Sequence, residues 1–359
     1  MPPPLTLACR AMAPDEGVIR KVRARLATGR GRASGWRGRA IALVLGVALA
    51  ACSRPEVAAP GAPTGGTAPP VPVVASFTIL ADMVASVGGE RVSVTSLVGP
   101  DGDAHVFSPG PADAKTLAGA RLVVVNGLGF EGWIDRLIAA SGYRGAVLVA
   151  SEGINGPQAT ATHAHDHGHA HRHGPGPAIG IDPHGWQSPA QARRYVANIA
   201  AGLARVDPAN AAHYAERAQA YDARIEALDR EARERFARVP EASRRVITGH
   251  DSFAHLGAAY GIRFFSPRGV STGGEASARD LARLARQVRE QRIRAVFVEN
   301  VTDPRLVEQL ARESGAKVGG VLFSDALSAK DARAGTYLAM MRHNIETIAS
   351  ALAEEVPAR

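Results

Sequence analysis

Residues 122–125 read Leu-Val-Val-Val, and this short run decides how the rest of the chain is interpreted. Four consecutive apolar residues indicate a strand that is buried on both faces, because a strand with one face in water alternates apolar and polar residues. Such strands are typical of parallel sheets, whose two faces are covered by helices. The run therefore predicts an α/β architecture.

Upstream of this run, strand and helix patterns alternate. We expect short strands at 73–76 and 92–98, and helices at 79–87 and about 111–119. The first helix carries apolar residues on one face and ends at a Gly-Gly pair, since glycine favours helix C-termini. The alternation predicts a parallel sheet flanked by helices.

Two long helices are expected in the middle of the chain. They start at a Ser-Pro and an Asp-Pro pair, which are typical of helix starts, and cover 188–205 and 207–238. The second helix would span roughly 45 Å, enough to join two lobes. Its apolar positions recur every three or four residues and predict one buried stripe: Tyr214, Ala218, Tyr221, Ile225, Leu228, Ala232 and Phe236.

The second half of the chain repeats the α/β pattern. Its expected strands are 245–248, 293–298 and 318–323, and its expected helices lie near 276–291, 303–314 and 335–354. An Asp-Pro pair at 303–304 gives the middle helix an N-cap. A second parallel sheet flanked by helices is therefore predicted.

The positive charge of the chain is concentrated in one segment. The formal net charge is +8, but residues 1–51 hold nine of the 42 Lys and Arg and two of the 34 Asp and Glu. This segment ends in an apolar run of eleven residues (41–51), which suits a signal-peptide core and is too short to span a bilayer as a helix. The remainder is nearly balanced, which argues against nucleic acid as a partner.

Cys52 directly follows the apolar run. Leu-Ala-Ala-Cys at 49–52 resembles the bacterial lipobox, in which the cysteine is lipidated and becomes the mature N-terminus, and we favour this interpretation. Ala-Leu-Ala at 48–50 also suits ordinary signal cleavage, and a start at Met12 would shorten an unusually long leader. Because Cys9 lies in the leader, no internal disulfide is expected, and a metal site must use histidines and carboxylates.

The segment after Cys52 is rich in Pro, Gly and Ala and is interpreted as a disordered tether to a lipid anchor in the membrane. We divide the chain into a signal peptide (1–51), a tether (52–71), an N-terminal α/β lobe (72–187) with a His-rich loop (160–178), linking helices (188–240) and a C-terminal α/β lobe (241–357).

Histidine occupies every second position of the tract within this loop: His163, His165, His167, His169, His171 and His173. Six of the twelve histidines fall here, and His-rich tracts favour metal binding because neutral imidazole is a common metal ligand. We expect an accessory that gathers zinc or senses its level. A solvated insert with incidental metal affinity is the alternative.

Four further residues are candidates for a metal site. His105, His250 and Asp325 each follow an expected strand, and His184 follows the His-rich tract. Ligands of open parallel sheets bind at the carboxyl ends of strands, so the four side chains would converge if the two halves face each other. Three imidazoles and one carboxylate suit zinc, and suit manganese or iron(II) less well.

From about residue 73 to 352 the chain resembles the periplasmic solute-binding proteins of zinc/manganese ABC transporters (cluster A-I). Six ordered stretches carry the resemblance: LVGPDGDAHVFSPGPAD (97–113), VVVNGLGFEGW (123–133), IDPHGWQSP (181–189), TGHDSF (248–253), FVENVTDPR (297–305) and VLFSDALS (321–328).

This resemblance implies two Rossmann-like lobes joined by a long rigid helix, with metal held in the cleft by His105, His184, His250 and Asp325. Manganese-handling members often have a carboxylate where this chain has His250, and zinc-specific members carry a His-rich loop, so zinc is expected ahead of manganese or iron(II). It also implies binding without catalysis, outside the cytoplasmic membrane, and delivery to an ABC permease. Loading by a metallochaperone stays open.

Two other functions are weighed against this one. Gly127, Gly129 and Gly132 match a G-x-G-x-x-G dinucleotide fingerprint, but in a later turn than that motif requires, so we interpret them as turn and packing positions. A zinc hydrolase with an open three-His site would need Asp325 not to bind, with Glu299 or Asp251 as base. No dense motif such as H-E-x-x-H supports it.

Carboxylates that orient the histidines are a further expectation. Glu275 and Asp251 are the candidates, with ordinary surface positions as the alternative.

Overall fold

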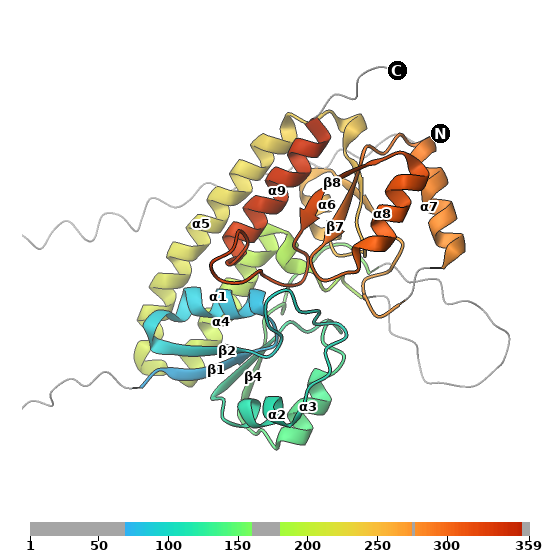
Figure 1. Cartoon of the computed structure of the whole chain (residues 1–359). Helices are drawn as coiled ribbons and strands as arrows, with labels where there is room; N and C mark the ends of the chain where they lie inside the picture. Colours follow the sequence, from blue (N-terminus) through green and yellow to red (C-terminus); the bar gives the residue numbers. More distant parts are fainter. Residues whose placement is uncertain (1–68, 160–179, 275–276, 354–359) are drawn as a thin grey trace, which may run out of the picture. The chain divides into compact units, whose positions relative to one another are not determined.

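The computed structural model describes residues 69–159, 180–274 and 277–353 (Figure 1). The expected leader, Cys52, the six tract histidines and Glu275 lie outside these residues. Among the helices that are described, none combines the length and apolar content needed to cross a bilayer.

The first sheet is built from four strands: β1 (Val71–Ala75), β2 (Val92–Ser96), β3 (Leu122–Val125) and β4 (Ala146–Val149). Their spatial order is β2-β1-β3-β4, and every neighbouring pair is parallel. The connecting helices are α1 (Thr78–Gly88), α2 (Pro111–Ala118) and α3 (Ile134–Ser141). All four residues of β3 are buried, which confirms the prediction made from this run.

The second sheet repeats this arrangement with β5 (Arg245–Ile247), β6 (Arg263–Phe265), β7 (Ala295–Glu299) and β8 (Lys317–Leu322). Its order is β6-β5-β7-β8, again parallel throughout, with one irregularity of register in β7. The helices between its strands are α6 (Ala254–Tyr260), α7 (Ala278–Glu290) and α8 (Pro304–Ser314). Both lobes are therefore doubly wound α/β units, as predicted.

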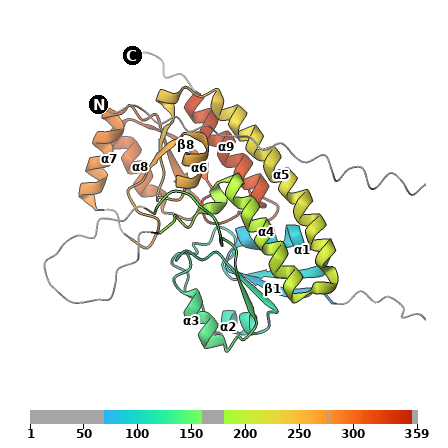
Figure 2. The same cartoon turned by 180° about the vertical axis from the view of Figure 1, so that it is seen from behind.

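Helices α4 (Pro189–Val206) and α5 (Ala211–Ala237) connect the two sheets along the chain, and α9 (Tyr337–Ala353) packs against α5 (Figure 2). The 27 residues of α5 correspond to about 40 Å of helix. Its buried residues are the seven of the predicted stripe, so the spacing of apolar positions located this face correctly.

Some expectations were wrong in detail. Residues 208–210 form a 3-10 turn, so the long helix begins at Ala211 rather than at the proline. Ser188 stands at the N-terminus of α4 but makes no side-chain capping bond, whereas Asp303 accepts one from the Arg305 amide as expected. The division of the chain at 187/188 and 240/241 stays a prediction.

The sequence patterns did not predict β4, α6 or β6. The strand β6 has three residues and α6 has seven, too few to show a period. The strand β4 lies at the edge of its sheet, where Val147 and Val149 are exposed, so it lacks the continuous buried run that identified β3.

Candidate metal centre

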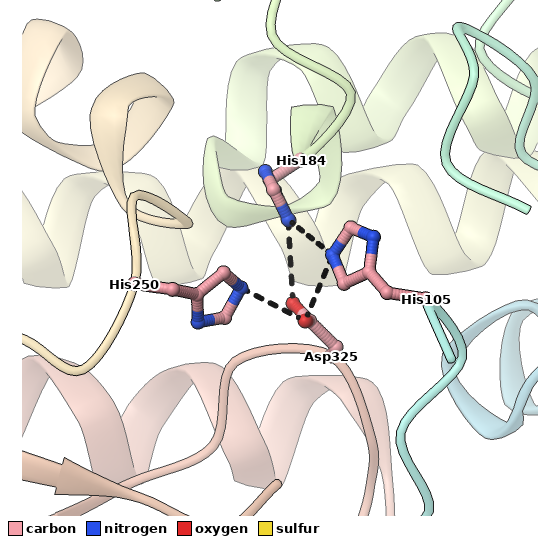
Figure 3. A group of neighbouring side chains, drawn as sticks. All are labelled: His105, His184, His250 and Asp325. Carbon is pink, nitrogen blue, oxygen red and sulfur yellow. Dashed lines mark hydrogen bonds and ion pairs between the residues drawn. The ribbon is translucent and has the colours of Figure 1, made fainter. Parts of the chain in front are cut away.

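The four predicted ligands lie together, as a group that we call the His3Asp cluster (Figure 3). His105 lies in the loop after β2, and His184 stands immediately before a 3-10 turn that leads into α4. His250 and Asp325 each follow a strand, β5 and β8, by three residues. The carboxyl ends of strands from both sheets thus contribute, as expected for ligand sites of open α/β sheets.

The distances within the His3Asp cluster suit a small cation at its centre. His105 Nε2 lies 3.3 Å from His184 Nε2 and 3.4 Å from Asp325 Oδ2. Asp325 Oδ1 lies 3.6 Å from His184 Nε2, and Asp325 Oδ2 lies 3.0 Å from His250 Nε2. One ligand atom from each residue lies within 4.8 Å of the others. Tetrahedral zinc with bonds of about 2.0–2.2 Å separates its ligand atoms by roughly 3.4 Å, close to the four distances of 3.0–3.6 Å.

Burial supports the same interpretation. His184, His250 and Asp325 are fully buried, and the side chain of His105 is 4% exposed. Among the described residues, both carboxylate oxygens of Asp325 and both ring nitrogens of His250 lack a partner with hydrogen-bond geometry. Buried polar atoms without partners are rare, because each costs free energy unless something satisfies it, and a metal ion would.

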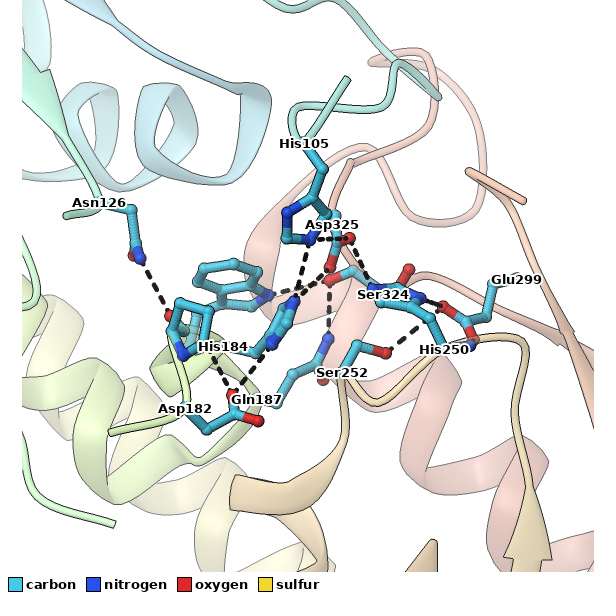
Figure 4. Close-up of polar contacts among 12 residues, drawn as sticks. His105, Asn126, Asp182, His184, Gln187, His250, Ser252, Glu299, Ser324 and Asp325 are labelled. Carbon is cyan, nitrogen blue, oxygen red and sulfur yellow. Dashed lines mark hydrogen bonds and ion pairs between the residues drawn. The ribbon is translucent and has the colours of Figure 1, made fainter. Parts of the chain in front are cut away.

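Two buried carboxylates stand behind two of the histidines (Figure 4). Asp182 Oδ1 accepts a hydrogen bond from the His184 amide at 2.8 Å and lies 2.9 Å from its Nδ1. Glu299 Oε1 accepts one from the His250 amide at 2.9 Å, and its Oε2 lies 2.6 Å from His250 Nδ1. Each contact leaves the opposite ring nitrogen, Nε2, facing the cluster.

These charges shift the protonation equilibria of the cluster. Burial alone would lower the pKa of His250, but the carboxylates of Glu299 and Asp325 outweigh it and raise that pKa well above its usual value. Burial would likewise raise the pKa of Asp325, but the neighbouring histidines hold it well below its usual value. For His105, burial dominates and lowers the pKa.

The loop that carries Asp325 is held by residues that lie far from it in the sequence. The indole N–H of Trp186 and the side-chain amide of Gln187 both donate hydrogen bonds to the Ser324 carbonyl, at 2.9 and 2.8 Å. From the other direction, Thr78 Oγ1 accepts a hydrogen bond from the Leu327 amide at 2.8 Å. These bonds fix the position of the carboxylate relative to the histidines.

Aromatic rings form one wall of the cluster. The Phe130 ring lies 4.5 Å from the His105 ring and 5.7 Å from the His184 ring, measured between centroids. Trp186 packs against both Phe130 and His184. A wall of this kind limits the access of water to bound metal.

Two orienting carboxylates that the structure shows, Asp182 and Glu299, were not predicted from the sequence. The expectation for Asp251 stays a prediction. Asp182 could have been found, because it stands two residues before His184 in the Asp-Pro-His stretch. Glu299 lies 49 residues beyond His250, and local spacing gives no sign of that contact.

The two competing functions find little support in the geometry. Asp325 lies with the three histidines rather than apart from them, so the open three-His site that a hydrolase requires is not what the fold builds. The fingerprint glycines Gly127 and Gly129 have φ angles of 85° and 76°, which agrees with turn positions that need glycine.

The fold and the His3Asp cluster together define a two-lobe α/β metal-binding protein. The family model described as zinc-uptake complex component A, periplasmic (ZnuA), matches residues 73–351, so the chain belongs to this family. It is a metal-binding component of an ABC import system rather than an enzyme. Components of this class lie outside the cytoplasm and work with a membrane permease, which in turn works with an ATPase.

Individual relatives differ in the metal that they are named for. The manganese-binding lipoprotein MntA of Bacillus subtilis is 33% identical over 285 residues, covering 78% of this chain and 89% of the relative. The iron-binding protein YfeA of Yersinia pestis is 29% identical over 283 residues, covering 79% and 86%. The solved structure of the periplasmic zinc-binding protein TroA of Treponema pallidum superposes with a TM-score of 0.71 at 29% identity, covering 79% and 100%.

Proposed function

We propose that this protein captures Zn²⁺ with His105, His184, His250 and Asp325 and hands it to the permease of its ABC importer. The observation that carries the proposal is the spacing of the four ligand atoms, which lie within 4.8 Å of one another in a buried site. The cluster supplies three imidazole nitrogens and one carboxylate oxygen, a set that suits tetrahedral zinc.

Zinc is proposed ahead of manganese and iron(II) because of the ligand set. Manganese prefers oxygen-rich, six-coordinate sites, whereas imidazole suits zinc. Among the described residues, Asp325 is the only carboxylate with both oxygens facing the three Nε2 atoms, since Asp182 and Glu299 lie on the Nδ1 side. Relatives named for manganese and iron make those two ions the alternatives to be tested.

We further propose that Cys52 is lipidated and that the residues between it and β1, which begins at Val71, tether the folded body to the outside of the cytoplasmic membrane. The lipoprotein names of relatives support this placement. The tract from His163 to His173 is proposed to gather zinc near the His3Asp cluster without forming part of it.

Metal analysis of the purified protein, followed by competition between zinc and manganese, tests the proposal. One equivalent of tightly bound zinc that excess manganese does not displace is the expected result. A His250→Glu variant, which replaces one nitrogen donor by a carboxylate, should shift the preference toward manganese. Tight binding of manganese in preference to zinc by the wild type would overturn the assignment of the metal.

A further inference from the structure

The three histidines of the His3Asp cluster differ in what supports each ring. A ligand histidine must present the lone pair of one ring nitrogen, and the hydrogen bond made by the other nitrogen decides which one that is. A supporting carboxylate also fixes the orientation of the ring and makes it a stronger donor. The contacts behind each ring therefore separate firmly held ligands from loosely held ones.

His184 is held at two points by one oxygen. Asp182 Oδ1 accepts a hydrogen bond from the backbone amide of His184 at 2.8 Å and lies 2.9 Å from Nδ1 of the same residue. Asp182 itself is fully buried. His255 of α6, also buried, donates from Nε2 to the Asp182 carbonyl at 2.8 Å. Asn126 adds a hydrogen bond to the next carbonyl, that of Pro183, at 3.0 Å.

Glu299 contacts His250 at two points, with one oxygen at the backbone amide and the other in a close ion pair with the ring. The distances are 2.9 Å to the amide and 2.6 Å to Nδ1. Glu299 is 1% exposed and lies at the end of β7, inside the second sheet. A rigid strand therefore positions the carboxylate that positions this ligand.

His105 has only half of this support. Asp103 Oδ1 accepts a hydrogen bond from the His105 amide at 2.9 Å, which holds the backbone. Among the residues that the structure describes, the one carboxylate within ion-pair distance of its ring is Asp325, on the Nε2 side. The ring leans against Phe130, and the next residue, Val106, is 55% exposed.

We infer that Asp182 and Glu299 are positioning residues that hold His184 and His250 ready for the ion, whereas His105 is the ligand that exchanges when the ion enters and leaves. This inference rests on the proposed function. His184, His250 and Asp325 form a fixed half of the site, and the hydrogen bonds from Trp186 and Gln187 hold the Asp325 loop in place. The His105 ring can turn away without breaking a carboxylate contact behind it.

Three isosteric variants test the positioning roles: Asp182→Asn, Glu299→Gln and, as a matched control, Asp103→Asn. Each keeps an oxygen acceptor for the backbone amide and removes the negative charge. Loss of a carboxylate behind a ligand histidine should weaken zinc binding by about 10- to 100-fold, measured by competition with a chelator. The Asp103→Asn variant should lose less zinc affinity than either of the other two, because Asp103 contacts the backbone of His105 and no ligand ring.

Nuclear magnetic resonance of the zinc-loaded wild type provides a readout that a merely structural role would not produce, and it does not depend on the folding of any variant. The Nδ1–H protons of His184 and His250 should be protected from exchange with water. The Nδ1–H proton of His105 should exchange rapidly with water, and the His105 ring should show motion on the microsecond-to-millisecond timescale. In Glu299→Gln, protection should be lost at His250 and kept at His184.

Equal protection of all three rings, or an Asp103→Asn variant as impaired as the other two, would overturn the inference. So would variants of Asp182 and Glu299 with wild-type zinc affinity. These outcomes differ from failure of the proposed function, in which the wild-type protein itself would bind no zinc at the His3Asp cluster.

Discussion

The two lobes have the same strand order, and each buries one glutamate at or shortly after the end of its third strand. In the first lobe, Glu131 accepts hydrogen bonds from Ser76 Oγ and from the backbone amide of Asn126, both at 2.6 Å. It also accepts one from the backbone amide of Gly127, at 3.1 Å. In the second lobe, Glu299 faces His250 through both of its oxygens. One glutamate therefore organises loops, and the other supports a candidate metal ligand.

The protonation of the two glutamates differs for the same reason. Burial raises the pKa of Glu131, and its neutral donors only partly oppose that rise. Burial acts on Glu299 too, but the charge of the His250 imidazole outweighs it and the pKa is lowered. The two glutamates therefore differ because neutral hydrogen-bond donors surround Glu131, whereas the imidazole of His250 faces Glu299.

The largest effect is expected when the cluster loses its carboxylate. Asp325→Ala removes the carboxylate that faces the three Nε2 atoms, and breaking a buried ion pair in this way costs about 3–5 kcal/mol, or roughly a hundredfold to several-thousandfold in zinc affinity. Isothermal titration against zinc measures it. Asp331→Ala, in an exposed position before α9, serves as the control and should bind normally. A loss of less than tenfold in Asp325→Ala would remove this residue from the ligand set.

The two glutamates should respond differently to the same substitution. Glu131→Gln presents an amide group to a backbone donor, and one unmade buried hydrogen bond costs about 1–3 kcal/mol of unfolding free energy. Zinc affinity should stay close to the wild-type value. Urea denaturation and zinc competition, run on this variant and on Glu299→Gln, compare the pair. The contrast between the lobes fails if Glu131→Gln loses as much zinc affinity as Glu299→Gln.

Acidity should weaken zinc binding, because protons compete for the same nitrogens. The pKa of His250 is raised above its ordinary value of 6.5, so protonation of His250 stabilises the metal-free protein. This stabilisation is fully present below pH 6.5 and is lost as the pH rises through the raised pKa. Asp325 and Glu299 have lowered pKa values, so their contribution is present above their ordinary values of 3.8 and 4.5 and is lost on acidification.

The rise in melting temperature that zinc produces should therefore be larger at about pH 8 than at about pH 5.5. Differential scanning fluorimetry with and without zinc measures this rise. A zinc-induced rise in melting temperature that is independent of pH would contradict ligation by the three histidines.

The smallest effect on the tight site is expected from deletion of 163–173. The His3Asp cluster is complete without the tract, so one tight zinc equivalent should remain while additional weak binding disappears. A zinc titration that counts both classes of site tests this. Disappearance of the tight equivalent would mean that the tract contributes a ligand.

The sequence predicted the ligands more completely than their supports. His105, His250 and Asp325 could be predicted because each follows a strand, and strand ends in parallel sheets converge at one edge. The stripe on α5 could be predicted because 27 residues show a clear helical period. Such features depend on local patterns, which survive in a single sequence.

The remaining features depend on contacts between distant residues. The pairing of Glu299 with His250 follows from the neighbouring positions of β7 and β5 in the second sheet, and that of His255 with Asp182, across 73 residues, joins the two lobes. The strand β6 exists because three residues pair with β5, and nothing in Arg263–Phe265 alone marks a strand. Tertiary packing thus decides which carboxylate supports which ligand.

The most direct test of zinc capture is X-ray diffraction from crystals of the zinc-loaded protein, recorded on both sides of the zinc absorption edge. A single strong anomalous peak is predicted at about 2.0–2.2 Å from Nε2 of His105, His184 and His250 and from a carboxylate oxygen of Asp325. A peak that omits any of these four residues, or one bound by other side chains, would contradict it.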